Sequence, residues 1–236
     1  VNVVMKIIFL RLMFIKICGI TNEQDALLAV ALGAEALGFI FAPSPRQVAP
    51  QRVKEIVRRL PQSVLTVGVF RDEHPQRVID TVREAGLFGA QLHGHESAAN
   101  VAEVMIDIKW VVKAVVAGSV EAKNADDYLT NLILVDSPLP GSGSTYDHDL
   151  LSEIPKTVRV LLAGGLTAEN VATAINQVAP WGVDVSSGVE KSHGYKDPIK
   201  LKRFIENARA AFEVLELVDE SENKKGANQP FNWDAQ

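Results

Sequence analysis

The sequence predicts a single (β/α)8 barrel, the α/β fold in which eight parallel strands alternate with helices. Short β-rich apolar runs alternate eight times with segments of helical periodicity, and no linker or shift in composition interrupts the series. Runs such as Val111–Val116 are apolar at nearly every position, which is typical of strands covered on both faces. An open, doubly wound sheet is the alternative that these observations leave.

The eight strands are predicted from short apolar runs that end at glycine, proline or polar residues. They are expected at Phe14–Cys18, Ala36–Phe41, Val64–Phe70, Gly89–Leu92, Trp110–Val116, Leu132–Asp136, Val158–Ala163 and Gly182–Val185.

The helices are predicted from apolar residues that recur with helical spacing between those strands. They are expected at Asp25–Leu32, Gln51–Leu60, Pro75–Ala85, Ser97–Ile106, Ala168–Val178 and Pro198–Phe212, with two short helices near Glu121–Tyr128 and Asp147–Glu153. Thr21–Gln24 has a capping-box pattern, Thr167 is expected to cap the seventh helix, and Asp197 precedes proline at the start of the last.

The two ends of the chain are expected to lie outside the barrel, which should span residues 13–219. Residues 1–12 are apolar but are interrupted by Lys6 and Arg11, and they are shorter than the roughly 20 apolar residues of a membrane span. We interpret them as a leader before a functional start at Met13, with a weak signal sequence as the alternative. Residues 220–236 are polar and aperiodic, which predicts a disordered tail.

The composition is that of an ordinary globular protein and excludes several classes. The chain has 236 residues, of which 47% are hydrophobic, and its single cysteine cannot form an intramolecular disulfide. Its net charge of −5 argues against a broadly basic surface that coats nucleic acid. The expectation is a cytoplasmic protein that binds neither nucleic acid nor membrane.

The single cysteine, Cys18, ends the first predicted strand, and Asp136 ends the sixth. The carboxyl ends of the strands form the face of a (β/α)8 barrel where chemistry is done. Across a closed barrel, these two side chains could serve as general base and general acid on one ligand. The alternatives are a core role for Cys18, as a small apolar residue, and a capping role for Asp136.

Two further strand ends carry polar side chains. Arg46 lies in the loop after the second strand, and its planar guanidinium suits a carboxylate, although it could also be a solvated loop charge. His93 follows the fourth strand as a polar group at the rim or as a structural histidine. Asp184, within the eighth strand, is a third candidate for substrate binding.

Glycines in the turns after the seventh and eighth strands predict a phosphate site. Gly164 and Gly165 form one turn, and Ser187 and Gly188 belong to the other. Glycine lets backbone N–H groups approach an anion closely, and a helix behind each turn would direct its N-terminus toward the same point. Barrels of this type commonly bind phosphate at these two turns. Because the net charge is negative, the attraction for a phosphate group would have to come from such a local anion site.

Distinct sequence motifs follow one another along the chain: KICGIT at 16–21, GFIFAPSPR at 38–46, VGVF at 67–70, QLHG at 91–94, AGGL at 163–166, and VDVSSGVE at 183–190 followed by KD at 196–197. In these motifs the chain resembles the phosphoribosylanthranilate isomerases of tryptophan biosynthesis. The resemblance extends from about Phe14 to Phe212.

This resemblance implies a (β/α)8 barrel without cofactor or metal, acting on a small phosphorylated substrate. The implied reaction is an Amadori rearrangement of N-(5′-phosphoribosyl)anthranilate to 1-(2-carboxyphenylamino)-1-deoxyribulose 5-phosphate. By motif, Cys18 would be the general base, Asp136 the general acid and Arg46 the residue that holds the anthranilate carboxylate. The AGGL and SSGVE segments would bind the phosphate.

The loop after the sixth strand departs from the family pattern at Pro140, Ser144 and His148, which puts its closure in doubt. One alternative function is the related isomerase of histidine biosynthesis, or a dual-substrate relative, which uses aspartate where this chain has Cys18. Another is a non-catalytic phosphate-binding barrel. The chain could act as a monomer or as a homodimer.

Overall fold

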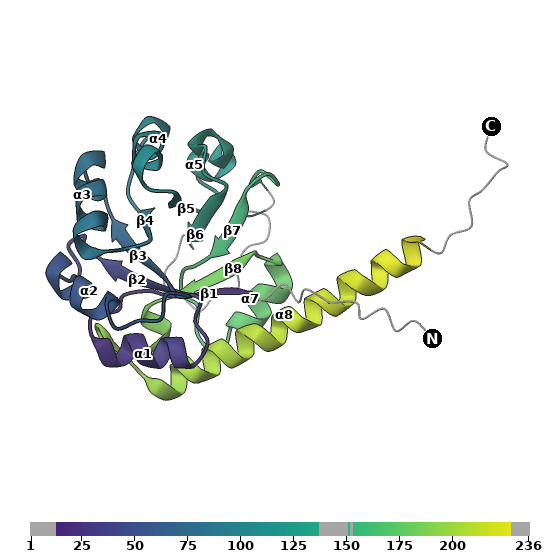
Figure 1. The fold of residues 1–236 in the computed structure, drawn as a ribbon. Helices are drawn as coiled ribbons and strands as arrows, with labels where there is room; N and C mark the ends of the chain where they lie inside the picture. Colours follow the sequence, from purple (N-terminus) through teal and green to yellow (C-terminus); the bar gives the residue numbers. More distant parts are fainter. Residues whose placement is uncertain (1–12, 137–150, 152, 228–236) are drawn as a thin grey trace, which may run out of the picture.

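Eight parallel strands close into a barrel in the order β1-β2-β3-β4-β5-β6-β7-β8 in a computed structural model of the chain. The structure describes residues 13–136, 151 and 153–227 (Figure 1). The last strand pairs in parallel with the first, which confirms the predicted (β/α)8 barrel and excludes the open sheet.

The strands lie within about two residues of their predicted bounds, which is the usual uncertainty of an element's end. They are β1 Phe14–Ile17, β2 Ala36–Ile40, β3 Leu65–Phe70, β4 Gly89–Leu92, β5 Trp110–Val116, β6 Leu132–Asp136, β7 Arg159–Leu162 and β8 Gly182–Val185. A small antiparallel pair, β9 Glu190–Ser192 with β10 Tyr195–Lys196, follows the barrel and was not predicted.

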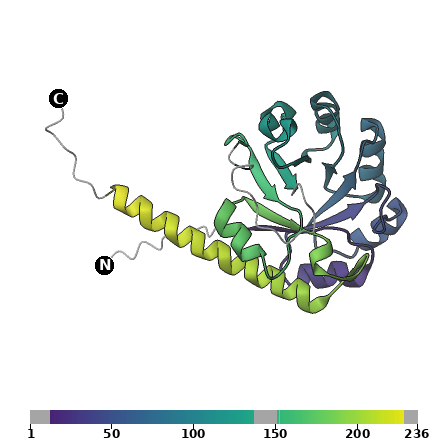
Figure 2. The ribbon, with the colours of Figure 1, turned by 180° about the vertical axis from the view of Figure 1, so that it is seen from behind.

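The helices lie outside the strands (Figures 1 and 2). They are α1 Glu23–Ala31, α2 Pro50–Val57, α3 Pro75–Ala85, α4 Ala98–Asp107, α5 Val120–Lys123, α7 Val171–Val178 and α8 Pro198–Ala227, with 3-10 helices η1 Ala125–Tyr128 and η2 Ser187–Val189. The short helix predicted near Asp147–Glu153, and Pro140, Ser144 and His148, fall largely or wholly outside the described residues.

Helix α8 is longer than the predicted helix, which ended at Phe212. Its first half packs Leu201, Phe204 and Ala208 against the barrel, where all three are fully buried. Both ribbon views show it continuing past the barrel (Figures 1 and 2). The helix reaches Ala227, so the predicted tail begins inside it, and residues 228–236 lie outside the described part.

Of the three predicted helix caps, Asp197 is confirmed, because it caps α8. The predicted Thr21–Gln24 capping box is wrong: α1 is capped by Asn22, which accepts a hydrogen bond from the backbone N–H of Asp25 at 2.9 Å. The prediction that Thr167 caps the seventh helix is wrong, because α7 begins only at Val171. Instead, the side chain of Asn170 accepts from the backbone N–H of Thr167 at 2.7 Å and forms a turn before the helix.

The barrel interior is filled by alternate residues of the strands. Phe14, Ala114, Leu134 and Ala163 belong to this inner cluster, while two larger clusters fill the space between strands and helices. At the amino-terminal end, the Phe14 ring stacks on Trp181 with centroids 4.6 Å apart. Aromatic side chains therefore fill the barrel interior at this end.

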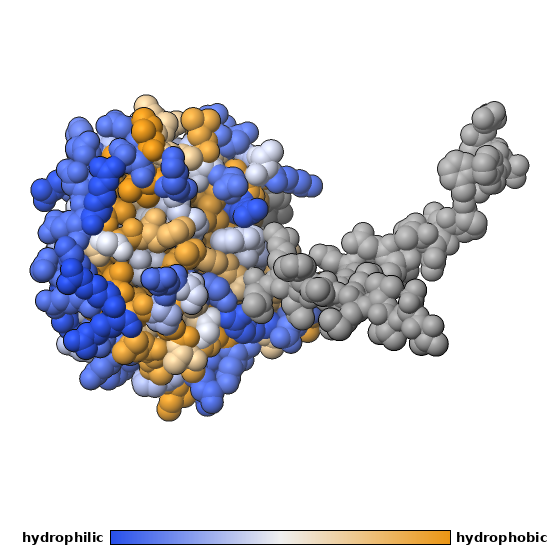
Figure 3. Space-filling view, viewed as in Figure 1, coloured by the Kyte–Doolittle hydropathy of each residue, from blue (hydrophilic) through white to orange (hydrophobic). Residues whose placement is uncertain are grey.

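The outer surface follows the amphipathic pattern of the helices. Hydrophilic residues dominate the edge of the molecule that α2 and α3 occupy in Figure 3, at the left of the view. Helix α3 turns Val78, Ile79 and Val82 inward. Among the described residues, no helix combines the length and apolar character needed to cross a membrane.

The first prediction concerns the closed amino-terminal end. A Cβ atom at Gly182 would lie 2.5 Å from the carbonyl oxygen of Phe14. Gly182→Ala should therefore destabilise the fold by about 1–3 kcal/mol, as overpacked cores do. Urea unfolding measures this, with Ile106→Ala, at a position 73% exposed, as the control that should shift by less than about 0.5 kcal/mol. An unchanged midpoint for Gly182→Ala would contradict the proposed crowding.

Candidate active site

A cavity of about 200 Å³ lies at the carboxyl end of the strands. Every predicted site residue except Arg46 lines it: Cys18, His93, Asp136, Gly164, Gly165, Asp184, Ser187 and Gly188. The sequence places them there because successive residues of a strand alternate between the two faces of the sheet. Residues two apart, such as Leu134 and Asp136, share the inner face, and the last of each series reaches the rim.

Buried polar atoms that lack hydrogen-bond partners also lie around this cavity. In the described part of the chain, buried side-chain atoms without a hydrogen bond are Oε1 of Gln91, Oδ1 of Asp136 and Oγ of Ser186. All three residues line this cavity. Buried polar groups are rarely left unsatisfied, so their convergence marks a place where a polar ligand supplies the missing bonds.

Lys16 lies two residues before Cys18 on the inner face of β1, where its side chain is fully buried. Its Nζ forms an ion pair of 2.8 Å with Oδ1 of Asp184, which is its partner residue on β8. Burial lowers the pKa of Lys16, but the charges of Asp184 and Cys18 outweigh burial and raise that pKa above its ordinary value. The lysine is therefore a permanent cation inside the barrel.

The Cys18 thiol lies beside this cation. Sγ of Cys18 and Nζ of Lys16 both lie beside Gly38, where a Cβ atom would be 2.8 Å from Sγ and 3.0 Å from Nζ. Burial raises the pKa of Cys18 above its ordinary value, and this effect exceeds the lowering by Lys16 and Lys196. The thiol is therefore protonated at neutral pH, with cations in place for the thiolate when it forms.

Arg46 pairs with a residue that the sequence analysis did not select. Its Nε and Nη2 donate to the two carboxylate oxygens of Glu190 at 2.8 and 2.7 Å, and Nζ of Lys196 donates to the same carboxylate at 3.1 Å. The hydrogen bond that Arg46 donates to Glu190 is the main cause that raises the pKa of Arg46. Lys196 also donates to the carbonyl oxygen of Cys18 at 2.6 Å, so this cluster adjoins the thiol.

Asp136 faces His93 across the cavity. Nε2 of His93 lies 3.5 Å from Oδ2 of Asp136. Nε2 of the Gln91 amide is 2.8 Å from Nδ1 of the same ring. The Gln91 amide and the Asp136 carboxylate therefore flank the two ring nitrogens of His93.

The glycine turns require glycine for two different reasons. Gly164 and Gly165 have φ of 88° and 63°, which side chains rarely adopt. Gly188 is instead pressed against the carbonyl oxygen of Leu166 in the neighbouring turn. A helix was predicted directly behind the eighth turn, but the structure has only the short 3-10 helix η2 there. The turns therefore bring backbone groups close to a ligand, without a long helix behind the last one.

Lys16, Glu190 and Lys196 are the residues that sequence reasoning missed. A lysine between apolar neighbours in the first strand is the sign that could have identified Lys16, because period-two alternation places it on the same face as Cys18. Glu190 and Lys196 were part of recognised motifs, but their contacts depend on the β9–β10 pair.

The second prediction concerns the thiol. Lys16→Met removes the cation beside Cys18, so the pH midpoint of Cys18 alkylation by iodoacetamide should rise by about 1–3 units. Because the chain has one cysteine, mass spectrometry reads the reaction directly. Removing one partner of a buried pair costs about 3–5 kcal/mol, so folding is checked by circular dichroism.

The companion variant is the double substitution Lys16→Met/Asp184→Asn. It removes both members of the ion pair, so no buried carboxylate is left without a partner. Its midpoint should still rise, because Lys16 affects the thiol pKa more strongly than Asp184 does. Lys202→Met, at a lysine with 60% of its side chain exposed, is the control and should leave the profile unchanged. Folded variants with the wild-type profile would contradict the assigned role of Lys16.

The comparisons with known proteins agree with this geometry. A family model described as N-(5'phosphoribosyl)anthranilate (PRA) isomerase matches residues 15–207. An N-(5'-phosphoribosyl)anthranilate isomerase of Bacillus cereus is 43% identical over 203 residues, covering 84% of this chain and 98% of that protein. A protein of the same description from Pelobacter propionicus is 44% identical over 202 residues, covering 83% of this chain and 95% of that protein.

Solved structures give the same result. The phosphoribosyl anthranilate isomerase of Thermotoga maritima is 39% identical, with a TM-score of 0.78, over 84% of this chain and 99% of that one. A family structure in complex with reduced 1-(o-carboxyphenylamino)-1-deoxyribulose 5-phosphate has a TM-score of 0.74 and 36% identity over the same shares. The chain belongs to the N-(5′-phosphoribosyl)anthranilate isomerase family.

Proposed function

We propose that this protein catalyses the Amadori rearrangement of N-(5′-phosphoribosyl)anthranilate to 1-(2-carboxyphenylamino)-1-deoxyribulose 5-phosphate, in tryptophan biosynthesis and in the cytoplasm. The observation that carries the proposal is the single cavity that combines a buried thiol beside a cation, a carboxyl group and two glycine turns. Membership of the isomerase family supports the same reaction. The substrate needs an acid, a base and a phosphate site, and this cavity offers a residue for each.

In the first step, Asp136 protonates the ring oxygen of the ribose, and the ring opens to a Schiff base. Asp136 suits this role because its side chain is only 27% exposed and its Oδ1 has no partner among the described residues. A proton donated inside a partly closed cavity reaches the substrate rather than water. His93, whose Nε2 approaches the other carboxyl oxygen, would orient the acid.

In the second step, Cys18 removes the proton from C2′ of the Schiff base, and the resulting enolamine tautomerises to the aminoketose. The thiol is protonated in the free protein because burial raises its pKa. Binding a cationic Schiff base adds a positive charge beside Lys16, and nearby positive charge favours the thiolate. The base would therefore form in the presence of substrate, and general base catalysis of this kind contributes roughly 10²–10⁴-fold.

The remaining predicted residues would bind the substrate. Backbone groups of the turns at Gly164, Gly165, Ser187 and Gly188 would hold the phosphate. Arg46 would bind the anthranilate carboxylate with the donors that Glu190 does not use, since the pair engages only Nε and Nη2. Asp184 would contact the substrate through Oδ2, because Oδ1 is paired with Lys16.

The chain is expected to act as a monomer or a homodimer. One solved relative is described as monomers generated from the dimeric enzyme of Thermotoga maritima. Sedimentation of this protein distinguishes the two states.

The third prediction tests the reaction itself. The wild-type protein should consume phosphoribosylanthranilate, and the decrease of the substrate's fluorescence measures this reaction. Cys18→Ser and Asp136→Asn should each retain the fold and lose about 10²–10⁴-fold in kcat, because each removes one proton-transfer group but little volume. Conversion of the imidazole ribotide of histidine biosynthesis in place of this substrate would contradict the proposed function. Half the wild-type rate in Cys18→Ser would show that another group is the base.

The fourth prediction concerns the carboxylate. Arg46→Ala should raise KM by roughly tenfold or more, because a charge-assisted hydrogen bond contributes about 1.5–3 kcal/mol. Inhibition by two product analogues, with and without the aromatic carboxylate, isolates the contact. Arg46→Lys, which keeps a cation beside Glu190, is the matched variant for local structure. An equal loss of affinity for both analogues would indicate that Arg46 does not bind this group.

A further inference from the structure

Another buried lysine, Lys113, lies outside the barrel, behind the residues that line the cavity. Lys113 is in the middle of β5, on the face that packs against the helices, and only 2% of its side chain is exposed. Its neighbours along the strand, Val112 and Ala114, belong to the inner cluster. The proposed reaction does not use Lys113, because the cavity is on the other side of the sheet.

The Lys113 ammonium contacts the loop that carries His93. Its Nζ donates to the carbonyl oxygens of Gly94 at 2.7 Å, Ala114 at 2.9 Å and Leu92 at 3.4 Å. It also forms a 2.9 Å ion pair with Oε2 of Glu96. Leu92 and Gly94 flank His93 in the sequence, so the lysine holds the backbone on both sides of it.

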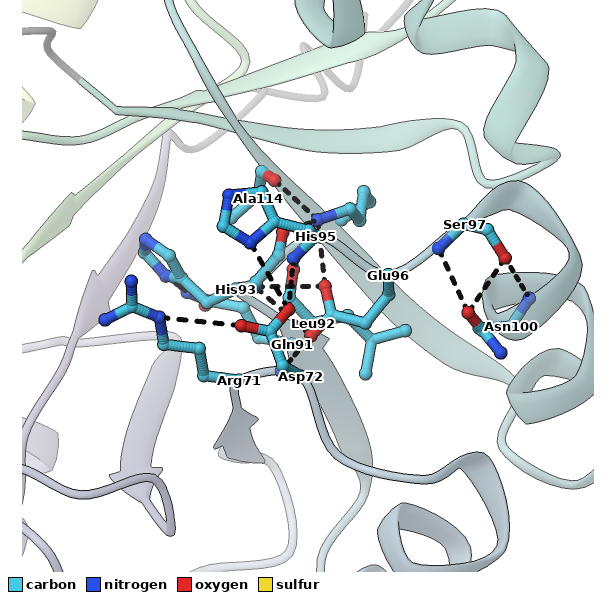
Figure 4. A network of polar contacts seen from close by, with 12 residues as sticks. Arg71, Asp72, Gln91, Leu92, His93, His95, Glu96, Ser97, Asn100 and Ala114 are labelled. Atoms are coloured by element: carbon cyan, nitrogen blue, oxygen red, sulfur yellow. Dashed lines mark hydrogen bonds and ion pairs between the residues drawn. The ribbon is translucent and has the colours of Figure 1, made fainter.

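Glu96 belongs to the same loop, and its carboxylate accepts backbone N–H groups (Figure 4). Its Oε1 accepts the backbone N–H of Asp72 at 2.9 Å, and its Oε2 accepts that of Gly94 at 2.9 Å. The Glu96 side chain is 3% exposed. One carboxylate therefore ties the loop after β4 to the loop after β3.

The two loops fit together too closely to move independently. Asp72 has a φ of 53°, in the left-handed region that residues with a side chain seldom adopt. Its Oδ1 accepts the backbone N–H of His95 at 2.5 Å, and a side chain at Gly94 would collide with it. The hydrogen bond from His95 is the main cause that lowers the pKa of Asp72.

His93 is the residue that this arrangement places. Its backbone N–H donates to the carbonyl oxygen of Phe70 at 2.8 Å, and its ring lies between Gln91 and Asp136. The ring is 3.5 Å from the carboxylate, so a small shift of the loop decides whether the two groups interact. Buried ion pairs often add little net stability to a fold. The Lys113–Glu96 pair is therefore better explained by the placement of this loop.

We propose that Lys113 and Glu96 are positioning residues, which hold the His93 loop so that its imidazole orients the Asp136 acid. The effect on rate rests on the proposed function, whereas the effect on His93 does not. A shift of about 1 Å at a catalytic group can cost roughly 10²-fold in rate, so support from behind the sheet matters to the reaction.

The test is Glu96→Gln, alone and combined with His93→Asn. Glutamine keeps the shape but can no longer accept all the hydrogen bonds that the carboxylate accepts. Glu96→Gln should lower kcat by roughly 10–100-fold with KM changed by less than about threefold, because the loop positions the acid rather than the substrate. In the His93→Asn background, the same change should alter kcat by less than about threefold, because its effect passes through His93.

Glu35→Gln is the matched control. Glu35 also accepts a backbone N–H, from Ile15 at 2.9 Å, and forms an ion pair of 2.6 Å with Arg209. It precedes β2, at the amino-terminal end of the barrel, so its loss should leave kcat unchanged. Equal effects of Glu96→Gln in the presence and absence of His93 would overturn the proposal, because they would indicate a general loss of structure.

A measurement that does not need the reaction completes the design. In protein labelled with 15N-histidine, the His93 signal is identified by its loss in His93→Asn. The wild type should show the signal of a ring held in one fixed hydrogen-bonding arrangement, and Glu96→Gln should show the averaged signal of a mobile ring. Lys113→Arg keeps the charge beside Glu96 but changes the donor geometry, and it should shift the signal in the same direction. It replaces Glu96→Gln in this measurement if that variant does not fold. A wild-type signal in both variants would overturn the proposal, and an inactive wild-type protein with these spectral changes would contradict only the proposed function.

Discussion

The site depends on the closure of the barrel between its first and last strands. Lys16 on β1 and Asp184 on β8 are partners in the strand register, and their side chains form a 2.8 Å ion pair inside the sheet. On one side of this pair, the Phe14 ring stacks on Trp181, and on the other, the backbone N–H of Cys18 donates to Val185 at 2.8 Å. Closure therefore brings the thiol at the end of β1 next to the turn after β8. In an open sheet, these two strands would not meet, and the base would be far from the phosphate turns.

The charges around the thiol explain how a buried cysteine can serve as a base. An apolar pocket alone would keep the thiol neutral, because burial disfavours the charged form. Lys16 and Lys196 counteract this, but each is neutralised in part by a carboxylate, Asp184 for the first and Glu190 for the second. The balance keeps the pKa of Cys18 above its ordinary value in the free protein. A substrate that becomes cationic during the reaction would change this balance where the proton must be removed.

The sequence predicted the strands and most of the cavity because both depend on local patterns. Cys18 and Asp136 were selected because each ends a predicted strand, and glycine marked the two turns. The partner of Arg46 could not be predicted in this way, since Glu190 is 144 residues away and meets it only through the folded β9–β10 pair. The start of α7 was predicted wrongly because Asn170 forms a local turn before it. Side-chain competition of this kind leaves no periodic pattern in the sequence.

A comparison of Lys113 with Lys16 shows why burial alone does not identify a catalytic group. Lys113 is surrounded by three carbonyl oxygens and a carboxylate, all held by the fold, so its charge is fully used in fixing the loop. Lys16 has one carboxylate partner and also faces a thiol, a group whose charge changes during proton transfer. Fixed partners make a cation structural, whereas a partner that can gain or lose a proton gives the cation a part in the chemistry. The barrel separates the two roles by the face of the sheet, with the structural lysine outside and the chemical one inside.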